Sequence, residues 1–326
     1  MPWYMSIIGH SQQLAQLEKD IATHNIAHSY LFSGPLHIGK FTIAKWFGKK
    51  ILSIGQPAKE ASCTEEQCDR LIHPDFLVLD MLWVEKLSED WDTIARFSNI
   101  SQQHRTKPKP KKTDAIGIEE IRCIQDRLAD TAVEGSRVCI IRSAERMQEA
   151  AASVLLKMLE EPLPGRIFIL TTQSPGSLLP TVKSRVRRLY FGRVYAKDLL
   201  PLVDGITEDE QRFLLSLAQG APGVLMRYKE NPDALRDARM RHERARSFWK
   251  TGSLQERIKL LDVLIERSGK SDELVTSIGL ALRETRPPYF ARAVKAYSKL
   301  VFGLQSNTNR PLLLQQFALG VSQDLQ

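Results

Sequence analysis

The sequence contains few cysteines and no long apolar run. Four cysteines occur in 326 residues and follow no disulfide-framework spacing, so we expect free thiols in a reducing compartment. No apolar run approaches the ~20 residues that a membrane-spanning helix requires. The charged-then-apolar pattern of a secretory signal is also missing from the N-terminus. We therefore expect a cytoplasmic protein that spans no membrane.

Acidic residues are outnumbered by basic ones. Asp and Glu total 38 against 46 Lys and Arg, which gives a formal net charge of +8. This charge fits an anionic neighbour such as nucleic acid, but the basic residues are scattered along the chain, so the charge alone identifies no partner. The length predicts two or three domains, and a hydrophobic content of 43% is enough for buried cores.

A phosphate-binding loop is present but incomplete. Gly34, Gly39 and Lys40 follow the pattern G-x-x-x-x-G-K-[ST], whereas Phe41 stands where the hydroxyl residue belongs. In a working loop that hydroxyl binds Mg²⁺ and the lysine reaches the outer phosphates. Thr42 is one helical residue further on, so its side chain is turned by about 100° and should not substitute.

The second set of metal ligands is also missing. The apolar run 138–141 leads into Arg142 and Ser143, where a P-loop ATPase carries its metal-binding acids. An arginine there repels Mg²⁺. Two independent losses predict that the chain does not hydrolyse ATP. Weak, metal-free nucleotide binding stays open, but a plain strand–turn–helix connection is the favoured interpretation of the loop.

Apolar periodicity predicts an α/β fold followed by helices. Short buried runs alternate with segments of helical spacing, which is typical of a parallel sheet with helices on both faces. Beyond Phe191 the pattern becomes wholly helical, so we expect a core at 1–191, a small helical lid at 192–230 and a larger helical domain at 231–326. The expected strands are 30–32, 76–79, 138–141 and 167–170, and the expected helices of the core are 11–24, 42–54, 118–128 and 147–158.

Residues 85–115 lose this periodicity. They end in the basic, proline-containing run 107–112, which can form neither a helix nor a central strand. We expect a surface excursion. A solvated linker is favoured over a phosphate contact for the basic run.

Motifs in a consistent order resemble one family. Ser184 and Arg185 match its serine-arginine-cysteine motif, with Val186 replacing the cysteine, and the helix that ends at Glu160, Glu161 and Pro162 is similar to its leucine-glutamate-glutamate-proline helix. The chain resembles the delta-prime subunits of bacterial DNA polymerase III clamp loaders, which belong to the AAA+ family. The similar segments are 8–9, 28–35, 73–76, 118–122, 150–162, 171–175, 184–185, 220–223 and 307–319.

The resemblance implies an architecture and a set of partners. It implies an AAA+ core with a P-loop, a lid, and a collar that packs with gamma/tau-like ATPase subunits and a delta-like subunit in a ring of five. This ring uses ATP to place a sliding clamp on primed DNA, as part of the DNA polymerase III holoenzyme, and the ATP is bound by the neighbours. A gamma/tau-like ATPase, and an AAA+-derived DNA-binding scaffold outside the replisome, are the competing interpretations.

The resemblance also assigns a role to Arg185. By the family motif it is an arginine finger, supplied in trans to the ATP site of an adjacent subunit. The guanidinium group of arginine is planar and permanently charged, so it can form two parallel hydrogen bonds to phosphate oxygens. The alternative is a surface arginine that pairs with an acid or joins Arg187 and Arg188 in a basic stretch.

Cysteine spacing does not favour a metal site. Many relatives carry four cysteines in a zinc-binding insertion after the P-loop helix, but here Cys63, Cys68 and His73 give three ligands where four are normal. We expect no zinc, and a degenerate loop with two free thiols in its place. Cys123 and Cys139 fall in apolar patterns and should be core residues. No Ser/His/Asp or Cys/His catalytic set stands out.

Overall fold

The computed structural model describes residues 7–79, 115–129, 132, 135–266, 269–306 and 308–322. The chain divides into two compact units, one made of residues 1–199 with 220–222 and the other of 200–219 with 223–326. The predicted division into three domains at 191 and 230 stays a prediction. Residues 85–114 of the expected excursion, including its basic run, lie outside the described residues.

A parallel sheet forms the centre of the first unit. Its strand order is β2-β3-β4-β1-β5, and all four neighbouring pairs are parallel. The strands β1, β2 and β3 are buried along their whole length, as expected for a sheet covered on both faces. The strands are β1 Ser29–Ser33, β2 Phe76–Leu79, β3 Arg137–Ile141, β4 Arg166–Thr172 and β5 Arg187–Tyr190.

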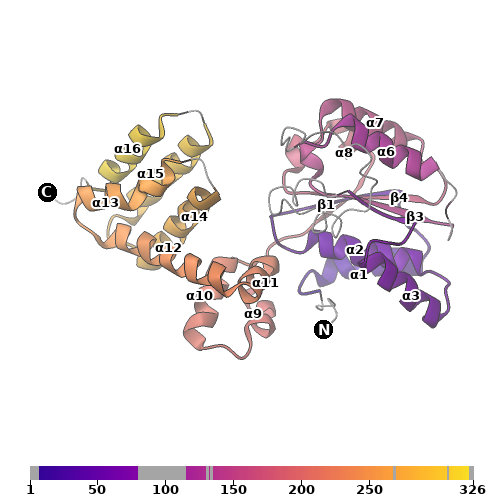
Figure 1. The fold of residues 1–326 in the computed structure, drawn as a ribbon, viewed down its shortest axis with the longest axis horizontal. Helices are drawn as coiled ribbons and strands as arrows, with labels where there is room; N and C mark the ends of the chain where they lie inside the picture. The colour runs from indigo at the N-terminus through magenta and orange to yellow at the C-terminus, as the bar shows by residue number, and fades with distance from the viewer. Residues whose placement is uncertain are drawn as a thin grey trace. The chain divides into compact units, whose positions relative to one another are not determined.

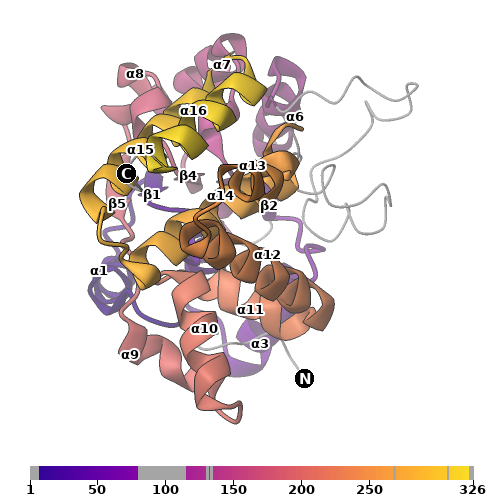
Figure 2. The same cartoon turned by 90° about the vertical axis from the view of Figure 1, so that its left-hand side faces the viewer.

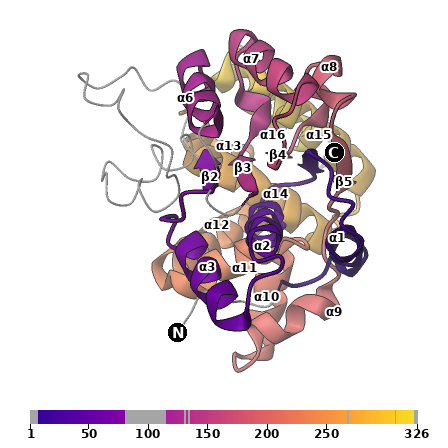
Figure 3. The ribbon, with the colours of Figure 1, turned by 90° about the vertical axis from the view of Figure 1, so that its right-hand side faces the viewer.

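Helices cover the two faces of this sheet. In Figures 1 and 3, α1, α2 and α3 lie on one face and α6, α7 and α8 on the other. Ile121 and Ile124 of α6 are fully buried and share a core cluster with Leu155 of α7 and Leu170 of β4. The predicted α/β class is therefore confirmed. The helices are α1 Ser11–Ala22, α2 Lys40–Leu52, α3 Ala58–Asp69, α6 Ile118–Ala129, α7 Glu149–Glu160, α8 Pro180–Lys183 and α9 Ala196–Leu199.

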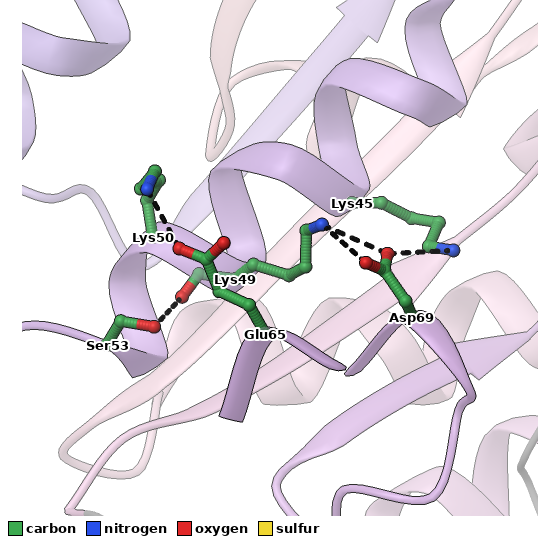
Figure 4. Close-up of polar contacts among 6 residues, drawn as sticks. All are labelled: Lys45, Lys49, Lys50, Ser53, Glu65 and Asp69. Atoms are coloured by element: carbon green, nitrogen blue, oxygen red, sulfur yellow. Dashed lines mark hydrogen bonds and ion pairs between the residues drawn. The ribbon is translucent and has the colours of Figure 1, made fainter. Parts of the chain in front are cut away.

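Helix α3 replaces the loop that was expected around the first two cysteines. Ion pairs tie it to α2, as Figure 4 shows: Asp69 lies 2.9 Å from the Lys49 ammonium and 3.6 Å from that of Lys45, and Glu65 lies 2.8 Å from that of Lys50. The expectation of a loop was wrong because apolar periodicity is weak in this segment. Pairing with the basic face of α2 supplies the contacts that a local pattern does not reveal.

The described residues of the second unit form helices and no strand, as predicted for the C-terminal part. In Figures 1 and 2, α10 and α11 lie on one side of the long helix α12, and α13, α15 and α16 on the other. The rings of Phe248 and Phe317 stack with centroids 5.1 Å apart in its core. The helices are α10 Glu208–Ala218, α11 Pro222–Glu230, α12 Pro232–Lys250, α13 Leu254–Leu261, α14 Gly269–Thr285, α15 Phe290–Gln305 and α16 Arg310–Ser322. Within the described ranges, no helix is both long and apolar enough to cross a membrane.

Candidate functional site: a rearranged phosphate-binding loop and an arginine at the far end of the sheet

The loop between β1 and α2 follows the path of a phosphate-binding loop. Gly34 has a φ of 147°, and a Cβ built there would lie 2.1 Å from the carbonyl oxygen of Phe191. Only glycine fits such a close approach. Gly39 precedes α2 with a φ of 94°. The backbone conditions for a glycine-rich strand–loop–helix turn are therefore met.

Lys40 is turned back onto this loop. Its ammonium donates hydrogen bonds to the carbonyl oxygens of Gly34, at 2.7 Å, and Pro35, at 2.5 Å. The residue is only 9% exposed. Burial lowers the pKa of Lys40 to about 8, with the charge of Arg142 acting in the same direction and that of Glu145 opposing it. The lysine thus already has two protein acceptors inside the loop.

Phe41 and Arg142, the two positions where the sequence predicts missing metal ligands, face each other. The guanidinium carbon of Arg142, which follows β3, lies 4.9 Å from the ring centroid of Phe41 in the first turn of α2. In a working ATPase the residues at these positions hold Mg²⁺ together. Here they form a cation–π contact instead. Thr42, the next residue of the helix, is exposed. The residues present therefore do not fit a Mg²⁺–nucleotide site of the usual kind.

One acid near the loop was missed by sequence reasoning. Glu145 lies in the turn after β3, and its Oε1 accepts a hydrogen bond from the backbone N–H of Gln173 at 3.5 Å. Among the described residues its Oε2 is buried without a hydrogen-bond partner. Its charge raises the pKa of Lys40, against the larger effect of burial. The sequence does carry a signal for Glu145, because it is an acid three residues after Arg142, the position where a metal-binding acid was expected.

Thr171 and Thr172, which begin the family-like segment 171–175, lie at the end of β4. The Thr171 hydroxyl accepts from the backbone N–H of Ser143 at 3.2 Å, and the Thr172 carbonyl accepts from that of Gly34 at 3.2 Å. The phosphate-binding loop, the β3 end and the β4 end are thereby connected through hydrogen bonds. Phe41, Arg142 and the phosphate-binding loop thus lie together at this end of the sheet.

Arg185 lies at the opposite end of the strands, beside the start of β1. It precedes β5, and its carbonyl accepts a 2.6 Å hydrogen bond from the hydroxyl of Ser29, the first residue of β1. The phosphate-binding loop begins at the other end of β1, and a five-residue strand measures roughly 13 Å between its first and last Cα atoms. Arg185 is therefore placed away from the chain's own loop.

The Arg185 side chain is held by local partners. Its guanidinium lies 2.9 Å from Glu160, the last residue of α7, and donates to the Thr181 carbonyl at 3.0 Å and the Ser184 hydroxyl at 3.1 Å. About a third of the side chain, 36%, remains exposed. Pairing with an acid was the alternative to the finger. Arg187 does not join Arg185 in a free basic stretch, because it pairs with the buried Asp20 at 2.8 Å.

The segment that contains Cys63, Cys68 and His73 forms a helix and structural hydrogen bonds. Cys63 and Cys68 both lie on α3, the first exposed and the second buried. His73 Nδ1 accepts from the backbone N–H of Asp75, whose carboxylate pairs with Arg137 at 2.7 Å. In the part of the chain that the structure describes, no three His, Cys, Asp or Glu side chains cluster as metal ligands would. The expectation of no zinc stays a prediction.

The fold and the loop define the class of protein. A five-stranded parallel sheet that carries a P-loop-type turn after β1, followed by a helical C-terminal part, is an AAA+ core with a helical extension. Residues 9–194 match the family model described as DNA polymerase III, delta subunit. This match covers more than half of the chain, and the chain belongs to that family.

Two curated relatives are DNA polymerase III subunits. The chain is 31% identical over 164 residues to DNA polymerase III subunit delta' of Pseudomonas aeruginosa, covering 49% of this chain and 41% of that protein. It is 24% identical over 283 residues to subunit tau of Bacillus subtilis, covering 86% of this chain and 43% of that protein. The matched stretches thus span less than half of these relatives. A gamma subunit-related structure from Thermotoga maritima has 19% identity and a TM-score of 0.46, covering 94% of this chain and 99% of its own.

Proposed function

We propose that this protein is a non-catalytic, delta-prime-like subunit of a replicative clamp loader. In this proposal it assembles in the cytoplasm with gamma/tau-like ATPase subunits and a delta-like subunit. Through that complex it supports ATP-dependent loading of a sliding clamp onto primed DNA. The contact between Phe41 and Arg142 carries the non-catalytic part of the proposal, because it places a ring and a cation where an ATPase binds its metal.

The loop around Lys40 supports the same conclusion. Its ammonium is bound to the Gly34 and Pro35 carbonyls, so reaching a phosphate would require breaking both hydrogen bonds. The positive charge of Arg142 nearby also disfavours a divalent cation. Neither Mg²⁺ nor zinc has a role of its own in the proposal, and ATP is bound by the neighbouring subunits.

The position of Arg185 supports a role in trans. It stands at the end of the sheet away from its own phosphate-binding loop, next to the edge strand β5. An arginine placed there can serve a nucleotide only on another subunit. In that role Arg185 would stabilise the charge that develops on the transferred phosphoryl group, after exchanging the Glu160 carboxylate for phosphate oxygens.

A reconstitution experiment tests this function. The chain is mixed with purified gamma/tau-like and delta-like subunits from the same organism, and the complex is isolated by gel filtration. We expect co-elution, together with clamp- and DNA-stimulated ATPase that depends on this chain. A chain that fails to co-elute with either subunit overturns the proposal. Magnesium-dependent ATPase of the chain alone, abolished by Lys40→Ala, would favour the gamma/tau-like alternative.

A further inference from the structure

The two terminal nitrogens of the Arg185 guanidinium have different kinds of partner. Nη2 lies 2.9 Å from the carboxylate of Glu160, at the end of α7. Nη1 donates to the Thr181 carbonyl at 3.0 Å and to the Ser184 hydroxyl at 3.1 Å. The partners of Nη1 belong to the turn that leads into Arg185 itself, whereas the partner of Nη2 comes from another helix. One side of the guanidinium is therefore held locally and the other by a partly exposed ion pair.

The hydroxyl of Ser184 connects this guanidinium to the end of a short helix. It donates to the Thr181 carbonyl at 2.9 Å and accepts from Nη1 of Arg185, so it uses both of the roles that a hydroxyl offers. Thr181 belongs to α8, Pro180–Lys183, and Ser184 is the residue that ends this helix. The last carbonyls of a helix have no acceptor role within the helix. Two oxygens of this turn, one from the backbone and one from Ser184, are thus directed at Nη1.

The main chain of Arg185 is also fixed. Its carbonyl accepts a hydrogen bond of 2.6 Å from the hydroxyl of Ser29, which is only 1% exposed. The register between β1 and β5 begins at Tyr30 and Arg187, so Ser29 extends the connection between the strands by a side chain. The backbone being fixed to the sheet, the remaining freedom of Arg185 lies in its side-chain torsions, and ordering these costs conformational entropy.

A simpler interpretation is that Ser184 only completes the end of α8. Serine hydroxyls often bond to a carbonyl three or four residues earlier. Ser177 does so, since it donates to the Ser174 carbonyl at 2.7 Å. Ser184 makes the same bond to Thr181 and differs in that its hydroxyl also accepts from a guanidinium. The two serines therefore form a matched pair in which only the contact with arginine changes.

We infer that Ser184 is the positioning residue of Arg185. Its hydroxyl and the Thr181 carbonyl hold Nη1, so that Nη2 points to a phosphoryl group of the adjacent subunit once Glu160 has been displaced. This role rests on the proposed function of Arg185 in trans. A donor that is already oriented needs no reorganisation when charge develops in the transition state. Ser184 itself touches neither ATP nor the reacting atoms.

Kinetics of the reconstituted loader test this role. Ser184→Ala should lower the maximal rate of clamp loading at saturating ATP by about three- to tenfold, as for one lost hydrogen bond to a charged group. The ATP concentration that gives half of the maximal rate should change by less than about twofold, because ground-state binding is kept. Ser184→Thr retains the hydroxyl and should restore the rate to within about twofold of the unmodified loader.

A double variant separates positioning from a general structural effect. Ser184→Ala/Arg185→Ala should be no slower than Arg185→Ala alone, because Ser184 acts only through Arg185. The matched control, Ser177→Ala, removes an exposed hydroxyl with the same bond to a carbonyl three residues earlier. It should load clamps at the unmodified rate.

The outcomes distinguish this role from the function on which it rests. An unchanged rate in Ser184→Ala, with Arg185→Ala slow, overturns the positioning role and leaves the finger intact. An unchanged rate in Arg185→Ala overturns both. Equal losses in Ser184→Ala and Ser177→Ala, a further loss in the double variant, or a Ser184→Ala chain that fails to assemble would make Ser184 a structural residue of the turn.

Discussion

The guanidinium of Arg142 lies over the ring of Phe41, 4.9 Å from its centroid, although the two residues are about a hundred positions apart in the chain. In the proposed function, each of them stands where a P-loop ATPase has a residue that binds Mg²⁺. The contact between them connects the end of β3 with the start of α2.

This contact should be measurable as a coupling energy. Phe41→Leu keeps an apolar side chain but removes the ring face, and Arg142→Ala removes the cation. In a double-mutant cycle from urea unfolding, we expect a coupling of about 0.5–1 kcal/mol that stabilises the folded chain. The free energy of unfolding lost in the double variant should be smaller than the sum of the losses in the two single variants. Strictly additive effects would mean that the two side chains are neighbours without interaction.

The purified chain should show no ATP turnover above background. Phe41→Thr alone should not create activity, because Arg142 and Ser143 still occupy the acid positions. Steady-state phosphate release with and without Mg²⁺ measures this, and Lys40→Ala is the control for contaminating ATPases. A Mg²⁺-dependent rate that disappears in Lys40→Ala would show that the loop works despite its replacements.

The buried lysine predicts a pH dependence of stability. The folded-state pKa of Lys40 is lowered to about 8, whereas an unfolded lysine titrates near 10.4. Between these values the unfolded chain binds more protons than the folded one, so Lys40 makes the free energy of unfolding rise with pH in this window. Below pH ~8 its contribution should be constant.

A comparison with Lys40→Met isolates that contribution. The free energy of unfolding of the unmodified chain minus that of Lys40→Met should increase between pH 8 and pH 10, and stay level between pH 6 and pH 7.5. Urea unfolding at these pH values measures it. Lys295→Met, at an exposed position on α15, is the matched control and should give a flat difference. A flat difference for Lys40→Met would contradict the lowered pKa.

Local patterns predicted most of the first unit and missed parts that depend on distant partners. Strands β1 to β4 were predicted because buried parallel strands form continuous apolar runs. Strand β5 was missed because Arg187 and Arg188 interrupt such a run, and its partner β1 supplies the hydrogen bonds along one side only. An edge strand carries its charge outward, which a search for apolar runs does not detect.

The site could be predicted in part for the same reason. Gly34, Gly39 and Lys40 are adjacent in sequence, so the loop was found. The contact of Phe41 with Arg142, and the pairing of Arg185 with Glu160, join separate elements. The direction of the Lys40 ammonium depends on backbone carbonyls that carry no sequence signal at all. Burial and hydrogen bonding of this kind become visible only in three dimensions.

Arg185 is the residue whose replacement should most affect the assembled loader. If it acts on a neighbour's nucleotide, Arg185→Ala should leave folding and assembly nearly unchanged. The clamp- and DNA-stimulated ATPase at that neighbouring site should fall, with trans arginines worth ~10³–10⁵ in rate in other phosphoryl-transfer systems. Arg185→Lys should not rescue it fully, because an ammonium lacks the planar fork.

The pairing with Glu160 provides the decisive comparison. The pair is partly exposed, 36% for Arg185 and 41% for Glu160, so breaking it should change the free energy of unfolding by no more than about 1 kcal/mol. If Arg185 serves only this ion pair, Glu160→Gln and Arg185→Ala should have equal effects in the reconstituted loader. If Arg185 is a finger, Arg185→Ala should slow ATP turnover and clamp loading while Glu160→Gln does not. Glu161→Gln, the exposed neighbour that removes the same charge, controls for that change. Equal rates for all three variants, or a failure of Arg185→Ala to assemble, would show that Arg185 is a structural residue.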